Sequence, residues 1–177
     1  DGDSWLEFRR VLFRSMNPFY HYGLENFLKK AEEFGVSGTV IPDLPYEMSQ
    51  KYEPIFKKYN KSNITFVAPT TPKERIKTLV ENSSKFIYMV AYAGITGSGR
   101  EEDLSQIIEN IREYSQTPLY IGFGIDEKTC KEKSKNLDGV IVGSAFVKHL
   151  LDDSLNNNEK IKKISSIAKE IKQKINE

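Results

Sequence analysis

Residues 119–125 read Leu-Tyr-Ile-Gly-Phe-Gly-Ile, and residues 139–146 read Gly-Val-Ile-Val-Gly-Ser-Ala-Phe. Each stretch contains a short apolar run typical of a strand, and each run ends in glycine. Taken alone, either glycine motif is equally typical of a turn at a strand end. Backbone N–H groups without shielding side chains can also bind a phosphate, and a helix that begins at Ser144 adds partial positive charge. Two such motifs on consecutive strands, followed by a short helix, indicate the phosphate site of a (β/α)8 barrel.

The rest of the chain alternates between strand and helix patterns. Short apolar runs predict five strands, at residues 38–41, 64–68, 86–91, 118–122 and 139–142. Apolar stripes at helical spacing predict helices between them, and a final helix carries one apolar face from Ile161 to Ile175. Thr71-Pro72-Lys73-Glu74 predicts a capping box, and Asp126 is expected to open another helix. This α/β order predicts a parallel sheet, either doubly wound or closed as a barrel.

The composition excludes several classes of protein. The chain has 177 residues, which corresponds to about one domain. Its formal net charge of +1 does not favour nucleic acid or an anionic membrane as a partner. Hydrophobic residues make up 38% and charged residues 29%, which favours a packed core over a disordered chain. No apolar run approaches the ~20 residues of a membrane span, no secretory signal is expected, and the single cysteine fits a cytoplasmic protein.

Seven short motifs follow one another along the chain. They are Met16–Phe19 with Tyr22-Gly23, Ile41–Pro45, Val67–Thr70, Phe86–Tyr88, Gly94–Gly97, Gly122–Ile125 and Val142–Lys148. Several families of phosphate-binding barrels share the last two motifs. A single family is indicated far more specifically by the combination of Pro42-Asp43-Leu44-Pro45 with Gly94-Ile95-Thr96-Gly97. From Asn17 to the C-terminus, the order and spacing of these motifs resemble those of the tryptophan synthase alpha chain family.

The resemblance implies a TIM barrel with a lyase activity in tryptophan biosynthesis. The family cleaves indole-3-glycerol phosphate to indole and glyceraldehyde 3-phosphate, and passes the indole to a beta chain in an α2β2 heterotetramer. Pyridoxal phosphate belongs to that beta chain, so we expect no cofactor and no metal on this chain. The expected substrate residues are Tyr88 beside the indole, Thr96 in a closing loop, and a phosphate-binding set of Gly97, Gly122, Gly124, Gly143 and Ser144.

The resemblance also suggests a partner surface. Asn17, Pro18 and Asp43 resemble positions that face the beta chain. For Asp43 the alternative is an acid at a helix N-terminus, and for Tyr88 it is a tyrosine of the barrel core.

The two catalytic carboxylates of the family lie upstream of the region of resemblance. They are a glutamate at the end of the second barrel strand and an aspartate in the loop after it, so we assign no catalytic residue in this chain. Because a complete barrel needs ~250 residues, we expect about five of the eight βα units, in one partial barrel domain at residues 16–177. We expect the chain as it stands to be inactive.

Residues 1–15 do not resemble the family, and two interpretations remain. They are either a foreign junction joined to a truncated chain, which we favour, or a divergent third strand with Val11-Leu12-Phe13 as its buried run. Two other functions also stay open. One is a non-catalytic chain that binds phosphate or a beta chain, and the other is a different phosphate barrel, such as a thiamine-phosphate synthase-like or prenyltransferase barrel.

Overall fold

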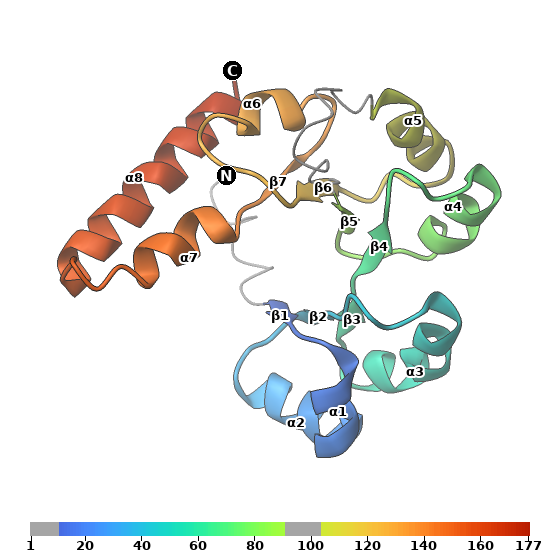
Figure 1. Cartoon of the computed structure of the whole chain (residues 1–177). Helices are drawn as coiled ribbons and strands as arrows, with labels where there is room; N and C mark the ends of the chain where they lie inside the picture. Colours follow the sequence, from blue (N-terminus) through green and yellow to red (C-terminus); the bar gives the residue numbers. More distant parts are fainter. Residues whose placement is uncertain (1–10, 91–103) are drawn as a thin grey trace, which may run out of the picture.

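The structure is a computed structural model that describes residues 11–90 and 104–177 (Figure 1). Its strands are β1 (Val11–Phe13), β2 (Gly38–Val40), β3 (Ser62–Asn63), β4 (Thr65–Val67), β5 (Ile87–Val90), β6 (Leu119–Gly122) and β7 (Gly139–Ile141). All pairings are parallel, in the orders β1-β2-β3 and β4-β5-β6-β7. Ile64 lies between β3 and β4, and its N–H donates to the Thr39 carbonyl of β2 at 2.8 Å, so the pairing with β2 extends one residue beyond β3.

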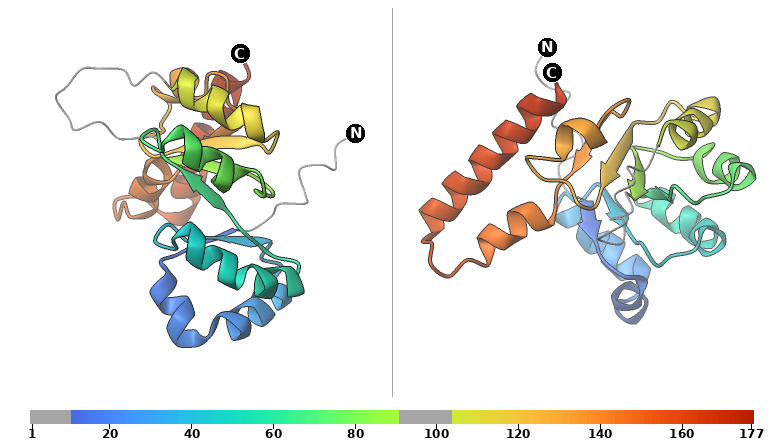
Figure 2. Two further views of the ribbon diagram at one scale, coloured as in Figure 1. Left: turned by 90° about the vertical axis from the view of Figure 1, so that its right-hand side faces the viewer. Right: turned by 45° about the horizontal axis from the view of Figure 1, so that its top comes forward.

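Helices follow the strands in the alternation that the sequence predicts. They are α1 (Met16–Tyr22), α2 (Leu24–Glu33), α3 (Tyr46–Lys58), α4 (Lys73–Val80), α5 (Ser105–Tyr114), α6 (Cys130–Lys133), α7 (Ser144–Leu150) and α8 (Asn157–Ile175). Figure 2 shows α1 to α5 outside an arc of strands. The arrangement is a partial (β/α)8 barrel, and each of the five predicted strand regions forms a strand within it.

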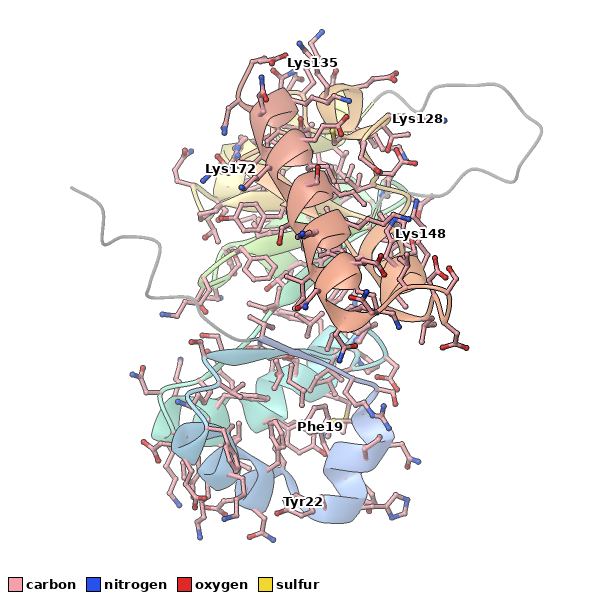
Figure 3. All side chains as sticks on the ribbon, turned by 90° about the vertical axis from the view of Figure 1, so that its left-hand side faces the viewer. Phe19, Tyr22, Lys128, Lys135, Lys148 and Lys172 are labelled. Carbon is pink, nitrogen blue, oxygen red and sulfur yellow. The ribbon has the colours of Figure 1, made fainter. Side chains whose placement is uncertain are left out.

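Alternate residues of the inner strands point to opposite faces of the sheet. Ile87 and Met89 of β5 face the helices and belong to the largest core cluster, together with residues of α4, α5 and α8. Tyr88 faces the barrel interior and packs with residues of β2, β4 and β6. A separate core surrounds Phe19 between α1, α2 and α3 (Figure 3). Because both faces are covered, β5 and β6 contain no charged or amide side chain, whereas β2 and β4 each include a threonine.

Two predicted helix starts are wrong. Thr71 does not cap α4, whose N-cap is Pro72 with no side-chain bond, because the Thr71 hydroxyl accepts a hydrogen bond from Ala68 N–H within a turn. The capping box of the chain lies instead at the start of α8, between Asn156 and Glu159. Asp126 does not open a helix directly, because its carboxylate holds a turn that precedes α6.

The N-terminal segment contains the strand of the second interpretation. Val11–Phe13 pairs with β2 residue by residue, yet Phe13 is 53% exposed rather than buried. Among the described residues no strand pairs with the other side of β1, which explains this exposure. The domain boundary at residue 15 stays a prediction.

The apolar face of α8 is covered along only part of its length. Ile167 and Ile171 are buried in the core cluster that also contains residues of β6, whereas Ile161 is 62% exposed. Leu150 and Leu151 at the end of α7 are exposed as well. The reason is geometric, because β7 is an edge of the described sheet and α7 and α8 extend past it (Figure 1). None of the helices in the described ranges is long and apolar enough to cross a membrane.

Candidate active site at the carboxyl ends of the strands

A cavity of about 530 Å³ opens at the carboxyl ends of the strands. Its walls are mostly apolar and come from several consecutive βα units: Phe13, Pro42, Phe66, Val67, Ala68, Thr71, Val90 and Phe123. The volume lies within the range of ~300–1,000 Å³ that small-molecule sites occupy. Barrel enzymes place their sites at this end, because loops from many strands converge there.

Tyr88 forms the aromatic wall behind this cavity. Its ring stacks on Phe66 with centroids 4.8 Å apart, and the Phe13 centroid lies 6.5 Å away. The side chain is only 4% exposed, and burial raises the pKa of its hydroxyl, which keeps the phenol neutral at ordinary pH. Tyr88 therefore belongs to the barrel core, which is the alternative expected for it, and it supports Phe66, which lines the cavity. A place beside the indole stays a prediction.

Tyr88 also explains why residue 122 is glycine. A Cβ on Gly122 would lie 2.7 Å from Tyr88 Cε1 and closer still to Cζ and Oη. Observed Cβ atoms essentially never approach other heavy atoms to less than 3.0 Å. Packing of the aromatic ring is therefore enough to require glycine here, whether or not its backbone binds a phosphate.

The loop after β6 has an unusual backbone. Phe123 has φ of +76° and Gly124 has φ of +64°, so two consecutive residues are left-handed. Such a conformation is uncommon for phenylalanine and is maintained only where surrounding contacts determine it. Here the Gly124 carbonyl accepts bonds from Thr129 Oγ1 at 2.9 Å and from Lys133 Nζ at 3.1 Å. The Phe123 ring is exposed and lines the cavity.

Asp126 stabilises the turn that supplies Thr129. One oxygen of its carboxylate accepts from the backbone N–H groups of Lys128 and Thr129, both at 2.9 Å, and lies 3.0 Å from Thr129 Oγ1, whose single hydroxyl proton is shared with the Gly124 carbonyl. Partial burial raises the pKa of Asp126, but these hydrogen bonds outweigh it and the net pKa is lowered. The charged carboxylate therefore holds Thr129 against the Gly124 carbonyl.

The second glycine motif lies beside the first. Gly122 pairs with Ile141 in the β6–β7 ladder, so Gly124 and Gly143 each stand two residues beyond a paired position. A Cβ on Gly143 would meet nothing within 4 Å, so the fold itself does not require glycine there. Ser144 begins α7, and the first N–H groups of a helix have no partner within it. The structure thus brings Gly122, Gly124, Gly143 and Ser144 to one rim, whereas Thr96 and Gly97 lie outside the described residues.

The three residues expected at a partner surface also lie together. Asn17 and Pro18 stand in the first turn of α1, and Asp43 follows β2. Asp43 Oδ1 accepts a hydrogen bond from Met16 N–H at 2.7 Å, so its side chain binds the N-terminus of α1. This is the alternative expected for Asp43. It does not exclude a partner, because Asn17 and Asp43 are exposed.

The comparisons with known proteins agree with this geometry. The family model described as the tryptophan synthase alpha chain matches residues 6–176. The chain belongs to this family. The match includes β1, which favours the interpretation of Val11–Phe13 as a barrel strand.

Relatives support the family assignment in sequence and in structure. The chain is 52% identical over 162 residues to the tryptophan synthase alpha chain of Wolinella succinogenes, covering 91% of this chain and 64% of that protein. It is 39% identical over 156 residues to that of Methanocaldococcus jannaschii, covering 86% and 55%. The solved alpha subunit from Campylobacter jejuni superposes with a TM-score of 0.79 at 36% identity, covering 89% and 64%. The chain thus spans less than two thirds of these relatives.

Membership of the tryptophan synthase alpha chain family supports a role in tryptophan biosynthesis and does not favour the non-catalytic alternative. Four residues at or near this site were not predicted from the sequence: Phe13, Phe66 and Phe123, which line the cavity, and Lys133, which contacts the loop after β6. Of these, only Phe123 had a visible signal, because it stands between the two glycines of a motif. Phe13 and Phe66 are far apart in sequence and meet at the cavity only through the barrel, whereas Lys133 contacts the loop after β6 from nine residues further along the chain.

Proposed function

We propose that the protein to which this chain belongs cleaves indole-3-glycerol phosphate to indole and glyceraldehyde 3-phosphate. The observation that carries the proposal is an apolar, aromatic cavity with two glycine loops on neighbouring strands at one rim. A ligand with an aromatic bicycle at one end and a phosphate at the other matches both features. The family relationship supports the same reaction.

Each part of the substrate has a proposed place. The indole ring would lie against the cavity wall formed by Phe66 and Phe123, with Tyr88 supporting Phe66. The phosphate would bind backbone N–H groups of Gly122, Gly124, Gly143 and Ser144, and we expect Gly97 and Thr96 to contribute as well. We propose no metal and no cofactor for this chain.

The cleavage needs an acid/base group and a carboxylate that steadies charge as the indole nitrogen gives up its proton. None of the described side chains that line the cavity is a carboxylate. We therefore expect this chain to bind substrate fragments without turning over indole-3-glycerol phosphate.

The natural partner we propose is a tryptophan synthase beta chain, which carries pyridoxal phosphate and receives the indole in an α2β2 complex in the cytoplasm. It would contact the surface formed by Asn17, Pro18 and Asp43. Gel filtration of the chain with a beta chain tests this proposal. A complex that forms with the unaltered chain and weakens with Asn17→Ala supports it, and the absence of any complex contradicts it.

Calorimetric titration tests the binding site directly. Glycerol 3-phosphate should bind to the chain and glycerol should not, because the rim recognises the phosphate. Indole should bind separately in the cavity. If neither glycerol 3-phosphate nor indole binds to the folded chain, or if the purified chain releases indole from indole-3-glycerol phosphate, the proposed division of the site is wrong.

A further inference from the structure

We propose that Lys133 is a positioning residue for the substrate phosphate, holding the loop after β6 through the Gly124 carbonyl and placing a positive charge beside the bound anion. The proposal rests on the proposed function, because it assigns a cation to the phosphate rim described above. The four rim residues assigned to the phosphate are glycines and a serine, which bring no charge of their own.

The contact between Lys133 and the loop is direct. Lys133 Nζ lies 3.1 Å from the Gly124 carbonyl oxygen and 3.0 Å from the point where a Cβ on Gly124 would stand. The ammonium group therefore occupies the space that the missing side chain leaves. A larger residue at 124 would displace the lysine as well as strain a backbone with φ of +64°.

This contact fixes the direction of a peptide group. Lys133 donates to the Gly124 carbonyl and Thr129 Oγ1 lies 2.9 Å from it, so the planar peptide that follows the Gly124 N–H assigned to the phosphate is held in one orientation. A phosphate bound at the loop would therefore meet groups that are already oriented.

The charge of Lys133 is available to an anion. Other lysines of this region form ion pairs, such as Lys131 with Glu177 and Lys174 with Glu170. For Lys133 no ion pair with a described carboxylate is present, and the side chain is half-buried. An anion on the Gly124 backbone would lie within the Debye length of ~8 Å at physiological ionic strength.

Three variants of the full chain test the proposal. Lys133→Met removes the charge and the donor but keeps most of the aliphatic length, whereas Lys133→Arg keeps both. Lys135→Met is the matched control, because Lys135 is an exposed lysine two residues away (Figure 3). The ligands are glycerol 3-phosphate, which is an anion, and indole, which is neutral.

We expect Lys133→Met to weaken glycerol 3-phosphate binding about tenfold, as a lost charge-assisted contact does. Lys133→Arg should stay within about threefold of the unaltered chain, and Lys135→Met should not differ from it. Indole affinity should be the same in all four chains, since a purely structural collapse of the site would reduce it too. Equal affinity of Lys133→Met and the unaltered chain for glycerol 3-phosphate would overturn the proposal. A loss of indole affinity in Lys133→Met as large as its loss of glycerol 3-phosphate affinity would overturn it too.

Amide resonances separate this inference from the proposed function. In the absence of ligand, Lys133→Met should shift the amides of Gly124 and Ile125, and Lys135→Met should not. If the unaltered chain does not bind glycerol 3-phosphate, the proposed function fails and the phosphate role of Lys133 with it, whether or not the amides shift. If phosphate binds and these amides stay in place in Lys133→Met, only the positioning role is overturned.

Discussion

Replacing Gly122 with alanine would place a methyl group against the ring of Tyr88. The new Cβ would lie 2.7 Å from Cε1 and closer to Cζ and Oη, well inside van der Waals contact. The ring cannot move away freely, because it is 4% exposed and stacked on Phe66 at 4.8 Å. Gly122 does not have a positive φ, so the cost comes from overpacking and not from backbone strain.

Overpacking of a well-packed core typically costs ~1–3 kcal/mol, and a ring confined on both sides places Gly122→Ala near the upper value, about 3 kcal/mol. Urea unfolding followed by far-UV circular dichroism measures this free energy. Gly143→Ala is the matched control, since its Cβ meets nothing within 4 Å, and should change stability by less than about 0.5 kcal/mol.

A double-mutant cycle with Tyr88→Ala tests the cause. Without the ring, Gly122→Ala should cost little, so the two substitutions should be non-additive by about 2 kcal/mol. Additive effects would refute the steric explanation, and so would a Gly122→Ala chain as stable as the unaltered one.

Three further predictions concern the rim and the partner surface. Gly143→Asp should abolish glycerol 3-phosphate binding in calorimetric titration without lowering the urea midpoint, because its carboxylate would stand in open space where the anion binds; retained affinity would remove Gly143 from the site. Asp43→Ala removes the acceptor of the Met16 N–H at the start of α1 and should cost about 1 kcal/mol of unfolding free energy, whereas an unchanged urea midpoint would show that the bond contributes nothing. The pKa of Asp126 is lowered in the folded chain, so the stability that its carboxylate contributes is present above its ordinary pKa and is lost as pH falls through the lowered value. The amide resonances of Lys128 and Thr129 should therefore move in acid, and a similar titration in Asp126→Asn would contradict this assignment.

Local sequence pattern was sufficient for most of the regular elements, although the helix α1 was not predicted. The β-branched runs and helical stripes depend on which face of each element is buried, and that periodicity is written in the residues themselves. Helix starts were harder to predict. The hydroxyl of Thr71 could accept a hydrogen bond from an N–H of α4 or from Ala68 N–H, and in the structure it accepts the one from Ala68. The solvent exposure of Phe13 and Ile161 was not predicted either. Both are apolar residues, and whether they are buried depends on which strands and helices lie beside them.

The sequence by itself determined the alternation of strands and helices, the family, and the two glycine motifs at the ends of consecutive strands. Only the tertiary structure decided what each glycine does. Gly122 accommodates Tyr88, Gly124 admits the ammonium group of Lys133, and Gly143 borders open space. The reason is physical: a missing side chain permits a close approach, and which group makes that approach depends on strand pairing across residues far apart in the chain.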